Sequence, residues 1–188
     1  MKELSLNILD IAENSLKAGA TLVEILLTQK DNILTIVIND NGFGMSKETL
    51  ETVANPFYTT RTTRKVGLGI PFFKEAAEQT GGSLTIDSTQ KETDPINCGT
   101  RVTAVFYTDS IDFTPVGDII STLTTLIHGS PNVDFVFIHI IENNQVTLDT
   151  REIREVLGND IPLNSPEIIS FIKDNLTAEY NEIKTNFK

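Results

Sequence analysis

The amino-acid sequence predicts an α+β fold, and three observations support this prediction. Apolar residues recur at helical spacing before residue 18. Two pairs of β-branched runs, at 21–39 and 83–107, have the composition of neighbouring strands. Glycines and polar turn residues separate these segments. A chain of 188 residues with 39% hydrophobic content is long enough for one full core and a modest extension.

Composition excludes several classes of function. A net charge of −11 argues against nucleic acid as a partner, because phosphate binding needs clustered Lys and Arg. Cys98 is the single cysteine, and only His128 and His139 could join it at a zinc site, so neither a disulfide nor a zinc centre is expected. No apolar run is long enough for a membrane span, and no signal-peptide core follows Met1. We therefore expect a soluble, cytoplasmic protein without a membrane partner.

The first predicted helix covers residues 3–18 and ends at Gly19. Its apolar side consists of Leu4, Ile8, Ile11, Ala12 and Ser15. A polar stripe follows at steps of three, four and three residues, formed by Asn7, Asp10, Asn14 and Lys17. The stripe has two interpretations. It is either the solvated face of the helix or a site in which Asn14 gives a carbonyl oxygen to Mg²⁺, Asp10 holds or orients a water, and Lys17 faces phosphate.

Two strands, at 21–28 and 33–39, are predicted to form a hairpin around residues 29–32. The second strand ends at Asp40, which opens the turn Asp40-Asn41-Gly42-Phe43-Gly44-Met45. Gly42 and Gly44 allow positive φ and the close approach of a flat ligand. A carboxylate accepts hydrogen bonds only, which suits the exocyclic amine of adenine. An ordinary Asp-Asn-Gly turn is the alternative interpretation.

A polar segment at 55–66 follows a short helix that Ser46 is predicted to cap and that extends to about Val53. The segment is long for a structureless connection, and it is rich in hydroxyl groups and basic residues, which is typical of lids. Its positive charge lies at Arg61, Arg64 and Lys65, which form either a small-anion site or a solvated loop.

The next motif, Gly67-Leu68-Gly69, leads directly into a helix predicted to end near Thr80. Glycines before a helix leave unpaired N–H groups and the positive end of the helix dipole available to phosphate. The chain lacks the sequence of a P-loop and the third glycine of a dinucleotide-binding fingerprint. Strands at 83–88 and 101–107 follow, and Thr100 is a candidate hydroxyl beside Asp40 or simply a residue favoured at the start of a strand.

Residues 109–188 form a separate, acidic extension. A helix is predicted at 117–127, a hairpin with strands at 133–141 and 145–148, a helix capped by Asp149 or Thr150 and ending at Leu157, and a last helix from about Ser165 to Asn181. Such a short segment has little core of its own, so we expect it to pack on residues 1–108. Its hairpin would either complete the sheet or supply a docking face.

Residues 3–107 resemble the ATP-binding domain shared by gyrase, heat-shock chaperone ATPases, histidine kinases and MutL, the GHKL superfamily. Residues 10–20 look like its N box, residues 40–45 its G1 box, residues 66–71 its G2 box, and Gly99-Thr100 its last-strand motif. The segment 55–60 is most similar to histidine kinases. The resemblance implies a Bergerat fold, an α+β two-layer sandwich whose mixed, mainly antiparallel sheet is covered by helices on one face, with a small α/β C-terminal extension.

The resemblance also implies a role for each matching residue. Asn14 would be the Mg²⁺ ligand and Asp40 would bind the adenine amine, with Gly42, Gly44, Met45 and Thr100 around the base. Gly67, Leu68 and Gly69 would place backbone donors at the phosphates. Lys17 matches the basic residue of the kinase N box, and Arg61 and Lys65 lie where that family has its lid. The catalytic position holds Asp10, where relatives have glutamate or asparagine, so hydrolysis is an open question.

The implied function is a cytoplasmic, Mg-ATP-binding regulatory protein in signal transduction. It would phosphorylate or switch a separate partner protein, in the manner of anti-sigma-factor kinases or detached histidine-kinase catalytic domains. No phosphoacceptor segment accompanies the motifs, because neither His128 nor His139 precedes an acidic residue as in kinase dimerisation helices. The alternatives are a slow, MutL-like ATPase whose lid drives association, with a homodimer as one state, and an ATP sensor without turnover.

Overall fold

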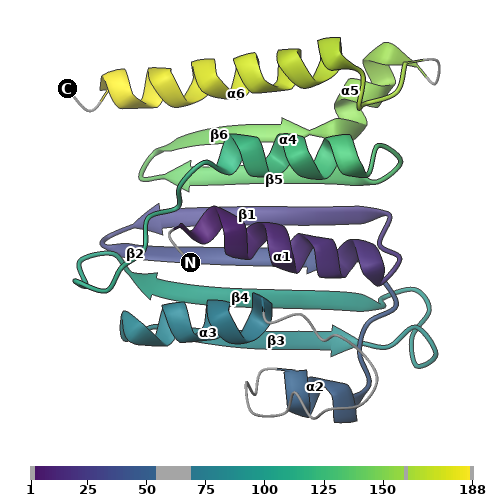
Figure 1. Cartoon of the computed structure of the whole chain (residues 1–188), viewed down its shortest axis with the longest axis vertical. Helices are drawn as coiled ribbons and strands as arrows, with labels where there is room; N and C mark the ends of the chain where they lie inside the picture. The colour runs from purple at the N-terminus through teal and green to yellow at the C-terminus, as the bar shows by residue number, and fades with distance from the viewer. Residues whose placement is uncertain (1–2, 54–68, 159–160, 187–188) are drawn as a thin grey trace.

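The computed structural model describes residues 3–53, 69–158 and 161–186. These residues form a six-stranded sheet with the order β3-β4-β2-β1-β5-β6 (Figure 1). The strands are β1 (Leu22–Lys30), β2 (Ile33–Asp40), β3 (Ser83–Thr89), β4 (Gly99–Tyr107), β5 (Asp134–Ile141) and β6 (Asn144–Asp149). Only the β1–β5 pairing is parallel among them. The predicted mixed, mainly antiparallel sheet is confirmed.

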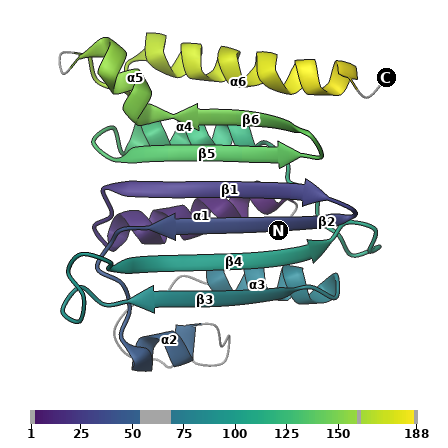
Figure 2. The ribbon, with the colours of Figure 1, turned by 180° about the vertical axis from the view of Figure 1, so that it is seen from behind.

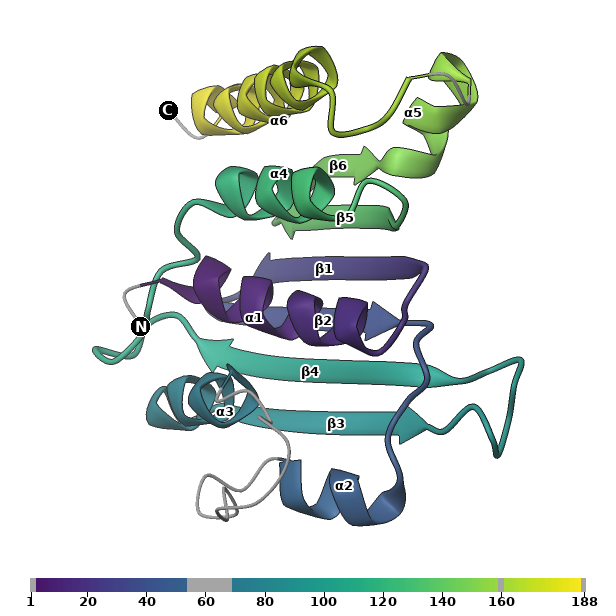
Figure 3. The same ribbon diagram turned by 45° about the vertical axis from the view of Figure 1, so that its right-hand side comes forward.

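Three helices cover one face of this sheet, as Figures 1 and 2 show from opposite sides. They are α1 (Leu4–Lys17), α3 (Gly69–Gln79) and α4 (Ile119–Gly129). The short α2 (Lys47–Val53) lies beyond β3, whereas α5 (Thr150–Leu157) and α6 (Pro166–Asn186) lie beyond β6 (Figure 3). The two-layer α+β class is therefore confirmed. None of the described helices combines the length and the hydropathy needed to span a bilayer.

Helix α1 buries the side that its apolar spacing predicts, from Leu4 to Ser15. The predicted polar stripe is less uniform than expected, because Asn7 is only 2% exposed. The first turn of α1 is packed against the segment that leads into α4: the backbone N–H groups of Leu4 and Ser5 donate to carbonyls in that segment, and Thr122 of α4 donates to the Ser5 carbonyl. This packing covers the first turn of α1 and leaves the polar residues of its later turns nearer the surface.

The β1–β2 hairpin brings the end of β2 to the middle of the sheet. Asp31 and Asn32 form its two-residue turn, with φ of 50° and 61°, a conformation that Asn and Asp tolerate better than most residues. The register then places Asp40 opposite Val23 of β1 and Thr100 of β4. The last residue of β2 is therefore held between two strands at one end of the sheet.

The C-terminal hairpin belongs to the same sheet. Strand β5 pairs in parallel with β1 over eight residues, Asp134–Ile141 beside Leu22–Gln29, and β6 follows antiparallel. Helix α6 continues to Asn186, beyond the predicted end at Asn181. The division of the chain into residues 1–108 and 109–188 stays a prediction, although the sheet runs across it without a break.

Candidate functional site

A cavity of about 250 Å³ lies between α1, the turn after β2, α2 and the start of α3. Ile11, Ile38, Ile70 and Val102 are among its apolar lining residues. Six predicted site residues line the same cavity, namely Asn14, Lys17, Asp40, Gly44, Met45 and Thr100. An apolar pocket with a few converging polar groups is the usual form of a small-molecule site.

Asp40 is the central polar group of this cavity and is 8% exposed. Its Oδ1 accepts hydrogen bonds from the backbone N–H of Gly42 at 2.9 Å and of Thr100 at 3.3 Å. Its Oδ2 accepts a bond of 2.6 Å from the Ser15 hydroxyl of α1. A carboxylate has about four acceptor positions, so these three bonds leave one position on Oδ2. The buried carboxylate is thus held rigidly while keeping capacity for one further donor.

Two glycines let the backbone pass close to its neighbours at this turn. Gly44 has φ of +67°, and a Cβ there would clash with the carbonyl of Thr89. A Cβ on Gly42 would lie 2.7 Å from the Ala18 carbonyl, which accepts a hydrogen bond from Phe43 N–H. The turn therefore requires glycine for packing against α1 and β3, which is a more specific reason than turn flexibility alone.

Ser88 is a site residue that the sequence analysis missed. Its hydroxyl lies 2.8 Å from the Met45 backbone N–H, 3.0 Å from the Gly99 carbonyl and 2.9 Å from the Thr100 hydroxyl. It joins the turn after β2 to the start of β4. The Thr100 hydroxyl therefore contacts Ser88, and the contact from Thr100 to Asp40 is made by the backbone N–H.

Asn41 was also missed as an anchoring residue. Its side-chain oxygen accepts bonds from the N–H groups of Thr21 and Leu22, and its amide donates to the Thr21 hydroxyl. These bonds attach the turn to the start of β1. An Asn directly after a predicted strand is a signal of side-chain to backbone bonding, although it does not identify the partner.

Two polar residues of α1 lie near the cavity and α3: Lys17 lines the cavity, and Asp10 lies beside Gly69. Asp10 contacts the first residue of α3, since a Cβ on Gly69 would lie 2.8 Å from the Asp10 Cβ. Partial burial raises the pKa of the Asp10 carboxyl above its ordinary value, the Glu13 carboxylate adds to the rise, and Lys17 opposes it. The Lys17 ammonium forms an exposed ion pair with Glu13 at 3.4 Å. Asp10 thus stands at the amino terminus of α3.

The side-chain oxygens of Asn14 and Asp10 fit a magnesium ion whose remaining ligands are water and the phosphate oxygens of a bound small molecule. The described residues contain no cluster of three or more His, Cys, Asp or Glu that could hold a metal by itself. Mg²⁺ typically takes one or two protein oxygens and completes its shell with water and phosphate oxygens. The Asn14 side chain on the cavity wall and Asp10 one turn away on the same face supply such oxygens.

The predicted phosphate loop and lid fall largely outside the described residues. Arg61, Lys65, Gly67 and Leu68 belong to the segment 54–68, whose positions are not described. Gly69 is the first residue of α3 and is buried. The predicted helix from Gly69 to about Thr80 is confirmed as α3, with Pro71 in its first turn.

Two curated kinases match about half of this chain. The chain is 30% identical over 90 residues to the sensor histidine kinase YvrG of Bacillus subtilis, which is 46% of this chain and 14% of that protein. It is 32% identical over 89 residues to sporulation kinase E of the same organism, 47% of this chain and 12% of the kinase. The chain therefore spans less than a fifth of the length of these two relatives.

A solved structure shares the fold over a longer range. The Aquifex aeolicus MutL ATPase domain complexed with ADP aligns with a TM-score of 0.51 and 15% identity, covering 93% of this chain and 88% of that one. The family model for histidine kinase-, DNA gyrase B- and HSP90-like ATPases matches residues 2–110, more than half of the chain. The cavity, its aspartate and its glycine turn lie within that range, and we conclude that this chain belongs to the family of histidine kinase-, DNA gyrase B- and HSP90-like ATPases.

Proposed function

We propose that this chain binds ATP with Mg²⁺ in the cavity between α1 and the turn after β2, and that it uses the nucleotide to phosphorylate or switch a separate partner protein. The carboxylate of Asp40 is the observation that carries the proposal. It is buried, it is held by three donors, and it keeps one acceptor position on Oδ2. An adenine amine supplies the donor that this position lacks, and the cavity volume suits a purine ring rather than a whole nucleotide.

The arrangement also predicts which base is preferred. Guanine carries an oxygen at the ring position where adenine carries its amine. That oxygen would face a carboxylate with no proton to donate, and an unpaired acceptor in a buried site costs about 1–3 kcal/mol. We therefore expect ATP to bind at least several-fold more tightly than GTP.

The phosphates would extend from the cavity along α1 toward the amino terminus of α3. Asn14 and Asp10 would hold the metal or its waters, and Mg²⁺ when bound would neutralise charge on the phosphates. The amino terminus of α3, beginning at Gly69, adds the positive end of a helix dipole on the same side. Lys17 on the cavity wall could exchange its exposed pair with Glu13 for a phosphate oxygen.

A separate acceptor protein is supported by the surroundings of the two histidines, since the exposed His128 is followed by a glycine and not by an acidic residue. His139 is 4% exposed and lies in β5, where a phosphoryl group cannot reach it. The curated relatives are sensor and sporulation kinases, which supports phosphoryl transfer as the chemistry. The fold likeness to MutL keeps a slow ATPase as the second candidate, since Asp10 contacts the start of α3 where an attacking water could be oriented.

Isothermal titration calorimetry of ATP with and without Mg²⁺ tests the binding step. Asp40→Asn keeps the size of the side chain and an oxygen for Gly42 and Thr100, but it places an amide donor where the adenine amine would donate. We expect the Kd for ATP to rise about 5- to 150-fold, equivalent to about 1–3 kcal/mol. Asp112→Asn, an exposed position, is the matched control. Equal ATP affinity in Asp40→Asn and wild type would refute the assigned site.

Single-turnover assays with labelled ATP then separate the candidate functions. Phosphate released by the purified chain and lost in Asp10→Asn indicates an ATPase. Label transferred to a copurifying protein indicates the kinase. Tight binding without release or transfer indicates a sensor, with Asn14→Ala as the metal-site control in each assay.

A further inference from the structure

A second hollow lies at the β6 edge of the sheet, away from the nucleotide cavity, and we propose that it binds a basic amphipathic helix of a partner protein. The groove runs between α5, α6 and the β5–β6 hairpin and has a volume of about 790 Å³. Its apolar lining includes Val136 and Ile138 of β5, Ile153 and Val156 of α5, and Ile168 and Phe171 of α6. The inference goes beyond the proposed function, because no residue lines both hollows.

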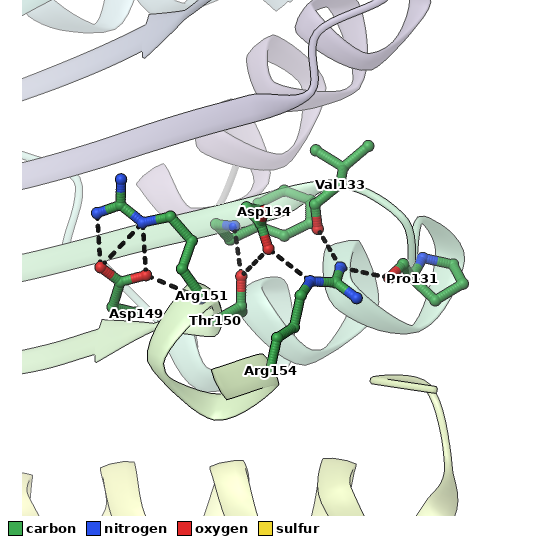
Figure 4. Close-up of polar contacts among 8 residues, drawn as sticks. Pro131, Val133, Asp134, Asp149, Thr150, Arg151 and Arg154 are labelled. Carbon is green, nitrogen blue, oxygen red and sulfur yellow. Dashed lines mark hydrogen bonds and ion pairs between the residues drawn. The ribbon is translucent and has the colours of Figure 1, made fainter. Parts of the chain in front are cut away.

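The groove is preformed, because hydrogen bonds hold α5 against the β5–β6 hairpin. Figure 4 shows how α5 is attached to the strands: the Arg154 guanidinium bonds Asp134 at 2.7 Å and the Pro131 carbonyl at 2.6 Å. The Thr150 hydroxyl accepts from Phe135 N–H at 2.8 Å and lies 3.1 Å from an Asp134 oxygen. Asp149 caps the helix by accepting from Arg151 N–H. A preformed groove binds at a lower entropic cost than one that must be ordered on binding.

Two exposed apolar side chains beside the groove favour a macromolecular partner over a small molecule. Val156 is 87% exposed and Phe171 is 57% exposed, and they stand on the two helices that face each other across the groove. A small molecule within the groove would leave the outer surface of both in water. A helix of about 10 Å diameter laid between α5 and α6 would cover them together.

The occupant is a helix rather than an added strand. A strand would have to pair with the free side of β6, but the Thr147 backbone N–H on that side already donates to the Glu179 carboxylate at 3.0 Å. Asn175 donates to the other Glu179 oxygen at 3.0 Å. Helix α6 thus satisfies part of the β6 edge and leaves the apolar groove beside it as the remaining binding surface.

Charge identifies the chemistry of the partner helix. The ionisable residues that line the groove are Asp149, Glu152 and Glu179, all acidic. Asp149 is neutralised by Arg151 at 2.6 Å, which leaves two carboxylates at the groove. Lys or Arg residues flanking an apolar stripe would complement them. A second copy would bring the same acidic groove and a net charge of −11 against the first, so self-association is disfavoured.

The test uses two labelled synthetic helices of about 18 residues, roughly 27 Å long. Both carry the same leucine stripe, and their polar faces are lysine in one peptide and glutamate in the other. Fluorescence anisotropy with the full chain should show saturable binding of the lysine peptide, weakening with salt. Val156→Gln and Phe171→Gln should each raise its Kd about 10-fold, and Glu152→Gln should reduce the salt dependence. Phe72→Gln, at an exposed phenylalanine of α3, is the matched control.

Several results would overturn the proposal. Equal binding of the glutamate peptide, or an equal loss in Phe72→Gln, would show that the apolar stripe binds anywhere. A dimer in sedimentation velocity that Phe171→Gln dissolves would assign the groove to a second copy. An apolar dye displaced by neither peptide would assign it to a small molecule. ATP titrations of the same variants should match wild type, so failure here is distinguishable from failure of the nucleotide site.

Discussion

Replacing Ser15 by alanine tests the contact that holds Asp40, the central carboxylate of the cavity between α1 and the turn after β2. The Ser15 hydroxyl donates to Asp40 at 2.6 Å, and the two residues are 4% and 8% exposed. A hydrogen bond to a charged group contributes about 1.5–3 kcal/mol to stability. Alanine recovers about 0.5 kcal/mol through its higher helix propensity in α1. The expected net loss in the free energy of unfolding is therefore about 1–2.5 kcal/mol.

The loss should lower the melting temperature by about 2–10 °C, since about 1 kcal/mol corresponds to 2–4 °C in a chain of this size. Urea unfolding followed by circular dichroism gives the free energy, and calorimetry gives the melting temperature. Ser170→Ala is the matched control, because Ser170 is an exposed helical serine whose hydroxyl lies 3.4 Å from an aspartate oxygen. A loss in Ser15→Ala of less than about 0.5 kcal/mol would refute a structural role for the bond.

Three further predictions concern other parts of the sheet. Gly44→Ala should destabilise the chain by at least about 2 kcal/mol, since it adds a Cβ at positive φ against a backbone carbonyl, whereas Gly129→Ala, with open space around its Cβ, should not. Equal urea midpoints for the two variants would contradict this prediction. Thr150→Val should lower the free energy of unfolding by about 1–3 kcal/mol, because it leaves the buried Phe135 N–H unpaired. Urea unfolding measures this loss, and hydrogen exchange of the Phe135 amide should become faster. Burial lowers the pKa of His139 to about 4, so this histidine binds a proton more readily in the unfolded chain than in the folded chain. Stability should fall by up to about 3 kcal/mol between pH 6.5 and 4, and His139→Gln should flatten the profile.

Most individual helices and strands could be predicted from the sequence because their signals are local. The apolar spacing of α1, the β-branched runs of β1 and β2 and the Asp149 cap of α5 each depend on neighbouring residues and a fixed backbone period. The family motifs marked the cavity residues from Asn14 to Thr100 for the same reason. Ends of elements were less certain: α6 continues five residues past the predicted end because residues 182–186 contain neither glycine nor proline, the residues that most often stop a helix.

Side-chain contacts between distant segments could not be predicted. Ser15 and Ser88 are ordinary serines in the sequence, yet one holds Asp40 and the other joins the turn after β2 to β4. The first turn of α1 likewise bonds to Thr122 of α4, more than 100 residues away in the chain. Nothing in a local pattern specifies which hydroxyl will meet which carboxylate, because a hydrogen bond depends on distances that only packing establishes.

The sequence by itself determined the fold class, the family motifs and the order of the elements, since these follow from side-chain periodicity and from backbone positions that require glycine. Only the tertiary structure decided that β5 lies parallel to β1 and so carries α5, α6 and their apolar groove at the edge of the sheet that lines the Asp40 cavity. The physical reason is that strand pairing joins residues more than 100 positions apart, and the chain's local preferences are compatible with several such pairings. The burial of one common hydrophobic core selects among them.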